Sequence, residues 1–140
     1  MDCIFCKIIA GEIPAVTVLD EELVLAFMDI NPSSPGHMLV TPKKHAENIF
    51  EISESDLAAV IRGVKRCATA VKEALKAEGV TVLQLNGKAS GQVVPHLHVH
   101  IMPRWANDGI KVSSWEMKPG DMEEIKGIAQ RVKEHLPSGS

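Results

Sequence analysis

The sequence contains no tyrosine and only 4% aromatic residues, and neither charge is in large excess, because 15 Lys and Arg stand against 18 Asp and Glu. The absence of a basic stripe argues against a nucleic-acid partner and against a polybasic membrane anchor. The longest apolar runs, such as residues 23–28, fall far short of the ~20 residues that span a bilayer. The N-terminus also lacks the basic and then apolar pattern of a secretion signal. We therefore expect a cytoplasmic protein with no membrane contact, whose partner is a small ligand.

Cysteine is scarce, and its number is odd. Three cysteines in a chain without a secretion signal indicate free thiols or a metal site rather than disulfides. Six histidines stand out against the shortage of aromatic residues. The sequence also lacks internal repeats, low-complexity segments and Pro/Gly/Ser-rich linkers. We therefore predict that residues 1–140 form a single domain.

The secondary structure is predicted from hydrophobic periodicity and from turn residues. The clearest element is a long amphipathic helix that begins at Ser53, with Asp56 in a capping arrangement, and continues to Gly79. The other expected elements are helices at residues 4–10 and 121–135 and strands at residues 16–19, 23–28, 37–41, 80–86 and 94–102. Consecutive strands with few helices predict an α+β fold with a largely antiparallel sheet.

Residues 95–103 alternate histidine with apolar residues, which places His96, His98 and His100 on one face of an extended strand. The strand rise separates His96 from His100 by about 13 Å, so the three imidazoles cannot all bind one zinc ion at ~2 Å. Imidazole can attack phosphorus, donate to phosphate oxygens and titrate near neutral pH. The run predicts a row of histidines that faces an anion. The alternative is an exposed strand face on which histidines are ordinary polar residues.

The histidine run and the upstream loop at residues 86–92 (NGKASGQ) resemble the signature of the histidine triad (HIT) superfamily, in its Hint-like branch of bacterial or archaeal type. Other matching segments occur in the same order, at residues 4–9 with 13–14, 27–32, 36–40 and 42–45. The resemblance covers residues 3–104 and leaves residues 105–140 as a C-terminal extension. It implies a HIT-like fold, with a five-stranded antiparallel sheet, one long and one short helix and a C-terminal helix. It also implies a homodimer joined around residues 80–86 and the long helix.

The resemblance assigns catalytic roles to the histidines. The middle histidine of the triad, here His98, is implied to attack the α-phosphorus of a purine nucleotide and to form a nucleotidyl-histidine that water hydrolyses. His100 is implied to donate to phosphate or leaving-group oxygens. His96 is the first member of the triad, and His37 matches a histidine that lies against it. Without the resemblance, His37 reads as an ordinary surface histidine.

The resemblance also implies a nucleotide pocket for an AMP-like ligand. Asp29 matches a carboxylate that accepts the ribose hydroxyls. Asn86 and Gln92 match polar residues around the phosphates, and Gly91 lets the loop backbone approach an anion. The apolar clamp around the base is matched by Ile4, Phe5, Ile8, Phe27 and Ile30. Plain core packing explains these apolar residues equally well.

Cys3 and Cys6 form a C-x-x-C pair, which is compatible with metal or redox chemistry. Only two residues precede Cys3, which disfavours the strand-to-helix turn of a redox motif. The resemblance implies a structural zinc ion bound by Cys3, Cys6, His45 and His96. The alternative is a pair of reduced thiols packed at the N-terminus. No organic cofactor is expected.

Taken together, these residues predict a purine nucleoside phosphoramidase or a related nucleotidyl hydrolase. A dinucleoside polyphosphate hydrolase is the alternative enzyme. A non-catalytic nucleotide-binding adaptor and a purely structural zinc module are alternatives of other classes. The sequence departs from the family pattern at Val93 and within residues 105–115, and both places shape the leaving-group side of the implied site.

Overall fold

The computed structural model describes residues 3–112, 115 and 117–137. In chain order the elements are α1 (Ile4–Ile9), β1 (Thr17–Asp20), β2 (Val24–Met28), β3 (Met38–Pro42), α2 (Glu54–Leu75), β4 (Gly79–Gln84), the short 3-10 helix η1 (Lys88–Ser90), β5 (Val99–Arg104) and α3 (Met122–His135). The strands form one five-stranded sheet in the order β1-β2-β3-β5-β4, and every neighbouring pair is antiparallel. The predicted α+β class, the antiparallel sheet and the long, short and C-terminal helices are therefore confirmed.

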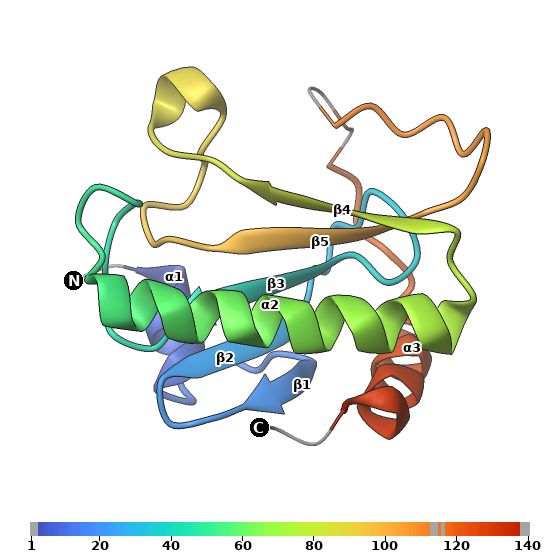
Figure 1. Ribbon diagram of the computed structural model, residues 1–140, viewed down its shortest axis with the longest axis horizontal. Coiled ribbons are helices and arrows are strands. Elements are labelled where there is room, and N and C mark those ends of the chain that lie inside the picture. The colour runs from blue at the N-terminus through green and yellow to red at the C-terminus, as the bar shows by residue number, and fades with distance from the viewer. Residues whose placement is uncertain (1–2, 113–114, 116, 138–140) are drawn as a thin grey trace.

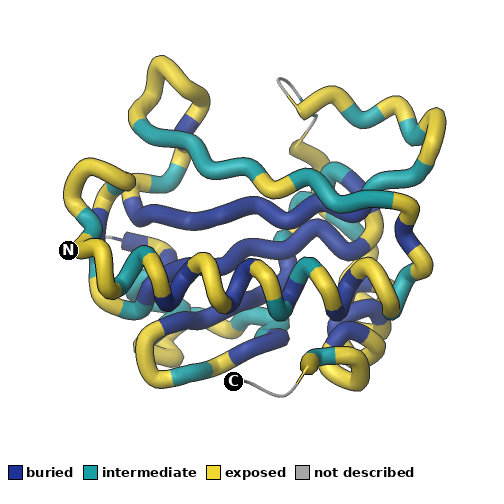
Figure 2. The backbone as a smooth tube through the Cα atoms, in the orientation of Figure 1, coloured by how far each residue is buried: buried dark blue, intermediate teal, exposed yellow. Residues whose placement is uncertain are grey.

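The two faces of the sheet have separate hydrophobic cores. On one face, α2 and α3 cover the side chains of Ala26, Val40 and Ile101, and the long helix lies over the sheet with its axis roughly along β3 and β5 (Figure 1). On the other face, α1 packs with Phe27 and Leu39. Figure 2 shows that the central strands are buried along their length, whereas β4 at the edge of the sheet is partly exposed. On the sheet face where α1 packs, none of the described α-helices covers the part formed by β5 and β4.

The helix limits follow from their caps. Ser53 caps α2 as predicted, since its side chain accepts a hydrogen bond from the backbone N–H of Asp56 at 3.1 Å. Asp121 caps α3 in the same way. The prediction that the long helix continues to Gly79 is wrong, because Lys76 adopts a left-handed conformation with φ 53° and ends it earlier. None of the helices in the described ranges is long and apolar enough to cross a membrane.

The histidine segment is less regular than predicted. Pairing in β5 begins at Val99, so the expected strand over residues 94–102 is wrong at its start and at its end. The backbone at Leu97 is held outside the ladder, because its N–H donates to the carbonyl of Ala46 at 2.8 Å and its carbonyl accepts from Thr41 Oγ1 at 2.7 Å. The chain therefore bends before β5, and the three histidines do not share one face of a regular strand.

Candidate active site

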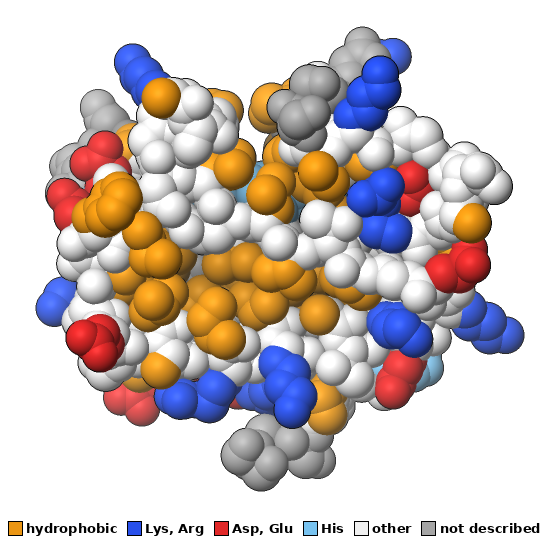
Figure 3. Space-filling view, turned by 45° about the horizontal axis from the view of Figure 1, so that its top comes forward, with side chains coloured by type: hydrophobic (Ala, Val, Ile, Leu, Met, Phe, Trp, Pro, Cys, Tyr) orange, Lys and Arg blue, Asp and Glu red, His pale blue; other side chains and the backbone are white. Residues whose placement is uncertain are grey.

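A cavity of about 740 Å³ opens on the sheet face opposite α2. Its floor follows a row of paired strand residues, in which Phe27 pairs with Leu39, Leu39 with His100, and His100 with Leu83. Paired residues point to the same side of a sheet, so the register places the imidazole of His100 between apolar side chains. In the space-filling view, histidine is visible between two projections of the surface, among hydrophobic side chains (Figure 3).

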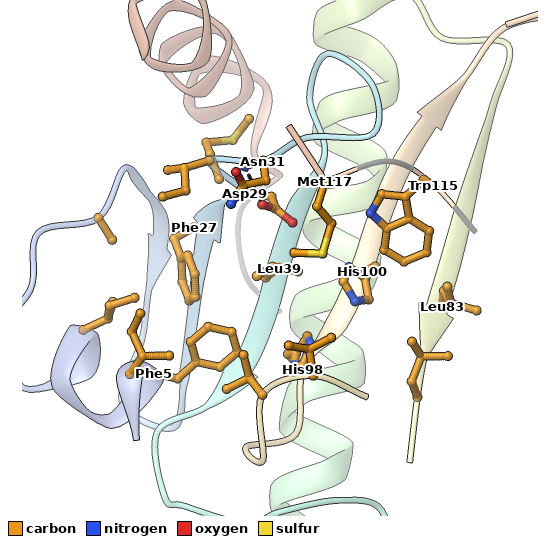
Figure 4. A pocket seen from close by; sticks show the side chains of 18 of the residues that line it. Phe5, Phe27, Asp29, Asn31, Leu39, Leu83, His98, His100, Trp115 and Met117 are labelled. Atoms are coloured by element: carbon orange, nitrogen blue, oxygen red, sulfur yellow. Dashed lines mark hydrogen bonds between the residues drawn. The ribbon is translucent and has the colours of Figure 1, made fainter. Parts of the chain in front are cut away.

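Two apolar walls flank the histidines that line the cavity. Figure 4 shows His98 and His100 between them. The first wall contains the residues predicted to clamp a base, and it consists of Ile4, Phe5, Ile8, Phe27 and Ile30. The second wall comes from β4, from the loop before β5 and from the segment after β5, and it consists of Leu83, Leu85, Val93, Val112 and Trp115. Met117 also lines the cavity and lies near Leu39, on the other side of His100 (Figure 4). The cavity is thus divided into two apolar parts by imidazole groups.

The tautomer of His98 follows from its backbone partner. Its Nδ1 lies 2.7 Å from the carbonyl oxygen of His96, and a carbonyl can only accept, so Nδ1 carries the proton. Nε2 therefore keeps its lone pair. Burial lowers the pKa of His98, which favours the neutral ring. His98 lines the cavity with only 7% of its surface exposed, and its ring is a neutral imidazole with a free lone pair on Nε2.

His37 fixes the opposite tautomer in His100. The backbone N–H of Ser33 donates to His37 Nδ1 at 3.0 Å, so the proton of His37 lies on Nε2. This Nε2 lies 3.0 Å from His100 Nδ1, which must accept, so the proton of His100 lies on its own Nε2. Burial lowers the pKa of His100 to about 3 and also lowers the pKa of His37. His100 is therefore a neutral hydrogen-bond donor in the cavity that His98 also lines.

Asp29 supplies the carboxylate of the site. It follows β2 and lines the cavity at the end of the first wall. One oxygen, Oδ1, accepts from the backbone N–H of Asn31 at 2.8 Å. The other oxygen, Oδ2, lies 3.5 Å from His37 Nε2. The carboxylate is thus held in place while its side chain keeps 16% exposure, so it remains able to accept hydrogen bonds from a ligand.

Beside the cavity, the four residues predicted to bind a metal come together at the N-terminus of α1. The Sγ atoms and Nδ1 atoms of Cys3, Cys6, His45 and His96 all lie within 4.8 Å of one another. His96 donates its Nε2–H to the carbonyl of Pro42 at 2.9 Å, so its Nδ1 lone pair points to the cluster. Burial lowers the pKa of His96, which keeps the ring in the neutral form that metals bind.

This cluster changes the prediction for the histidine row. His98 and His100 line the cavity, whereas His96 is fully buried and is turned to the cysteines. The ring of Phe5 separates the two sites, with its centroid 5.8 Å from that of His96 and 5.0 Å from that of His98. The metal cluster and the cavity therefore share a wall, and two of the three histidines rather than all three face the cavity.

Two polar residues near the loop before β5 were predicted to surround the phosphates. These residues, Asn86 and Gln92, are not among the described residues that line the cavity. Gln92 is 8% exposed, accepts from the backbone N–H of Gly87 and donates to the carbonyls of Glu47 and Val94. The Asn86 side chain pairs with that of Gln84 and accepts from the backbone N–H of Ile49. Both amides hold the loop in which Gly91, with φ 99°, lines the cavity.

The second wall was predicted only in part. Val93 and residues 105–115, which include Val112 and Trp115, were expected on this side of the site, whereas Leu83, Leu85 and the nearby Met117 were not. These residues come from separate segments and share no period. The one local signal is Trp115 itself, an exceptional residue in a chain with two tryptophans.

Comparisons with known proteins identify the family of this chain. A family model described as the HIT domain matches residues 10–107. A HIT-like protein of Methanocaldococcus jannaschii is 47% identical and aligns over 88% of this chain and 95% of its own length. An adenosine 5'-monophosphoramidase of Schizosaccharomyces pombe is 40% identical, with 97% of this chain and 99% of that protein covered.

Solved structures give the same result. A HIT-like protein from Bartonella henselae superimposes with a TM-score of 0.90 at 40% identity, over 96% of each chain. A zinc-bound histidine triad family protein from Mycobacterium smegmatis superimposes with a TM-score of 0.86 at 30% identity, over 97% of this chain and 94% of that one. The fold expected from the motifs is thus the fold of these proteins.

Proposed function

The chain belongs to the HIT domain family, and from this premise we propose that it hydrolyses purine nucleotide conjugates at the α-phosphorus, with adenosine 5'-phosphoramidates as the substrate class. The observation that carries the proposal is the opposite tautomers of two neighbouring histidines in one cavity. His98 presents a lone pair and His100 presents an N–H. A displacement at phosphorus needs both a nucleophile and a donor for the oxygen charge, so this pairing favours an enzyme over an adaptor.

The nucleotide is proposed to bind along the first wall. Phe5 and Phe27 meet edge to face with ring centroids 5.4 Å apart, and they offer apolar surface to a purine. Asp29, at the end of this wall, has a carboxylate that can accept both ribose hydroxyls. With the base and ribose in these places, the α-phosphate comes to lie over His98 and His100.

The proposed reaction has two displacements. His98 Nε2 attacks the α-phosphorus, and the P–N bond breaks with its electron pair going to the amine nitrogen, which takes a proton from solvent. The His98 Nδ1–H bond to the His96 carbonyl stabilises the positive charge that grows on the ring, while His100 Nε2–H donates to a phosphate oxygen. Water then attacks the phosphorus and releases His98. The hydroxyl of this water remains on AMP and its other proton goes to solvent, so one water molecule is consumed for each P–N bond that is cleaved.

The charges around the cavity favour this substrate class over dinucleoside polyphosphates. A polyphosphate leaving group carries several negative charges, and Lys or Arg side chains normally stabilise them. The described residues that line the cavity include no Lys and no Arg. An amine leaving group needs no such partners. Comparing turnover of adenosine 5'-phosphoramidate and diadenosine tetraphosphate distinguishes the two candidates.

We also propose a structural zinc ion at Cys3, Cys6, His45 and His96. Tetrahedral zinc with two thiolate and two imidazole ligands has ligand atoms about 3.3–3.8 Å apart. Here Cys3 Sγ and His96 Nδ1 are 3.3 Å apart, Cys6 Sγ and His45 Nδ1 3.3 Å, Cys6 Sγ and His96 Nδ1 3.6 Å, and the two Nδ1 atoms 3.1 Å. The donor set and its spacing therefore fit zinc. Bound zinc would fix α1 to the histidine segment and hold the His96 carbonyl that positions His98.

A homodimer remains a proposal as well, formed by β4 and α2. Both elements expose large apolar side chains, with Ile61 51% and Val82 49% exposed. Figure 3 shows hydrophobic side chains gathered on the surface in this view. Sedimentation equilibrium tests this proposal, and a monomer at micromolar concentration contradicts it.

The central test of the function is hydrolysis of adenosine 5'-phosphoramidate to AMP. His98→Ala should lose turnover by at least about a thousandfold, because the nucleophile is removed, and should still bind AMP. His135→Ala is the matched control, since His135 lies exposed in α3, away from the cavity. A wild-type protein that binds AMP and cleaves no phosphoramidate supports the adaptor instead.

A further inference from the structure

We propose that Thr41, through its hydroxyl, is a positioning residue for the nucleophile of the reaction. It holds the backbone at Leu97 in the conformation in which the His96 carbonyl accepts from His98 Nδ1. The kinetic consequence rests on the proposed function, whereas the hydrogen bonds belong to the fold itself. Thr41 is not among the described residues that line the cavity, so it acts through the backbone and not on a ligand.

Thr41 lies in β3 at the point where the pairing with β5 stops. The last pair at this end joins Val40 to Val99. One step further along the same register, Thr41 would face His98, but β5 begins at Val99 and this pair is not formed. Instead, Thr41 Oγ1 donates to the carbonyl of Leu97 at 2.7 Å. A side-chain hydrogen bond thus joins the two segments beyond the end of the ladder.

This hydrogen bond is buried at both ends. Thr41 and Leu97 are both fully buried, so water does not compete for the hydroxyl or for the carbonyl. A buried backbone carbonyl that loses its partner costs free energy, and the chain around it tends to move until the carbonyl finds another donor. The hydroxyl of Thr41 therefore constrains Leu97 more tightly than an exposed side chain does.

Two hydrogen bonds orient the peptide groups on either side of Leu97. The N–H of Leu97 donates to the carbonyl of Ala46 at 2.8 Å, and it belongs to the same peptide group as the His96 carbonyl. This peptide is trans, so its N–H and C=O point in opposite directions, and the bond to Ala46 sets the direction of the His96 carbonyl. Thr41 holds the next peptide group, which leads to His98. With both peptides held, His98 Nδ1 meets the His96 carbonyl at 2.7 Å.

A regular strand would not make the bond between His98 and the carbonyl two residues before it. In a strand, side chains stand roughly perpendicular to the sheet, whereas carbonyls point along the sheet toward the neighbouring strands. The bend at Leu97 is therefore required for this contact. Without the Thr41 hydroxyl, the Leu97 carbonyl loses a donor and its peptide is free to turn. His98 then loses a fixed acceptor, and its proton can move to Nε2, the nitrogen that attacks phosphorus.

Thr41→Val tests the proposal, because it removes the hydroxyl and keeps the branched shape of the side chain. In protein labelled with ¹⁵N at histidine, the wild-type NMR spectrum should show His98 protonated only at Nδ1, and Thr41→Val should show both tautomers. The signal is assigned by its loss in His98→Ala. With adenosine 5'-phosphoramidate, kcat should fall at least about tenfold in Thr41→Val, while AMP affinity changes less than about twofold. Thr41→Ser keeps a hydroxyl and should restore the wild-type tautomer and most of kcat.

Thr69→Val is the matched control. Thr69 Oγ1 also donates to a backbone carbonyl, that of Lys65 at 2.8 Å, but it lies in α2 on the other face of the sheet. This variant should keep the wild-type tautomer and kcat. If Thr41→Val does not fold, as judged by AMP binding, Thr41→Ala compared with Thr41→Ser isolates the hydroxyl in the same way.

A folded variant without the Thr41 hydroxyl that keeps His98 in the wild-type tautomer overturns the proposal, whatever its kcat. Failure of the proposed function looks different. The wild-type protein would then leave adenosine 5'-phosphoramidate uncleaved, while the ¹⁵N signals of His98 would still respond to Thr41→Val.

Discussion

The Nε2 atom of His37 lies 3.0 Å from the Nδ1 atom of His100, and this contact determines which nitrogen of His100 faces the cavity as a donor. His37 can act as the donor in this pair only because its own Nδ1 accepts from the backbone of Ser33. A backbone group therefore determines the tautomer of His100 through His37, which is fully buried, and in the proposed mechanism His100 is the donor to the phosphate. His37 is not among the described residues that line the cavity, so the proposed mechanism gives it a positioning role.

Replacing His37 tests this relationship. His37→Asn removes the group that holds the His100 tautomer, so the His100 ring can rotate or present the wrong nitrogen. We expect kcat for adenosine 5'-phosphoramidate to fall by about 10²-fold, the range typical for loss of one oxyanion donor, with AMP affinity changed much less. The measurement is steady-state kinetics beside an AMP titration. An unchanged kcat would show that His100 needs no support from His37.

The buried neutral histidines should make the protein sensitive to acid. Burial lowers the pKa of His100 to about 3, and that of His37 is lowered as well. In the unfolded chain both return to about 6.5, so below this pH the unfolded state binds more protons than the folded state. Their contribution to stability is complete above pH 6.5 and is lost as the pH falls toward the folded-state pKa. For each of these two histidines, the free energy of unfolding falls by about 1.4 kcal/mol per pH unit between its unfolded-state and its folded-state pKa.

Urea unfolding at pH 7 and at pH 5 measures this loss. His100→Asn should show a smaller decrease in the free energy of unfolding between the two pH values than the wild-type protein. His135→Asn should match the wild type, because His135 is exposed. Equal decreases in the wild type and His100→Asn would contradict burial of a neutral imidazole.

The sequence predicted those parts of the molecule that depend on local pattern. The periodicity and the Ser53 cap predict α2, and the order of motifs predicts the HIT domain family, which is confirmed. The C-terminus of α2 was missed, because it ends at a left-handed lysine rather than at a glycine. Lys76 adopts this left-handed conformation at a cost in free energy, and the composition does not indicate it. The sequence therefore did not predict where α2 ends.

Contacts between distant segments explain what the sequence could not predict. The histidine segment alternates as a strand does, but hydrogen bonds from Thr41 and to Ala46 hold Leu97 away from the sheet. Similarly, the cavity brings together Leu83 from β4 and Met117 from the C-terminal segment. No local pattern marks Leu83 as part of a site, and Met117 lies two residues beyond the segment that the sequence indicated. Only the fold reveals that these side chains line the same cavity.

Asp29 provides a test of where the nucleotide binds. If its carboxylate accepts the ribose hydroxyls, the wild-type protein should bind AMP about tenfold more tightly than 2',3'-dideoxy-AMP, as expected for hydrogen bonds to a charged group. Asp29→Asn should bind both ligands with similar, weaker affinity. Isothermal titration calorimetry of both proteins with both ligands gives the coupling free energy between Asp29 and the ribose hydroxyls directly. The reverse finding, an undiminished preference for AMP in Asp29→Asn, would place the ribose elsewhere.

The metal proposal is tested by elemental analysis and thermal unfolding of protein purified without added zinc. We expect about one zinc ion per chain, its loss in Cys3→Ser, and a lower Tm after treatment with a chelator, because a structural site contributes binding energy to the folded state. Cys67→Ala is the matched control, since Cys67 is equally buried but lies in α2 outside the cluster, and it should keep the zinc. Metal-free wild-type protein would leave the cluster as two reduced thiols beside two neutral imidazoles. If zinc is present, Cys3→Ser should also slow phosphoramidate hydrolysis, because the His96 carbonyl that holds His98 Nδ1 belongs to a metal ligand.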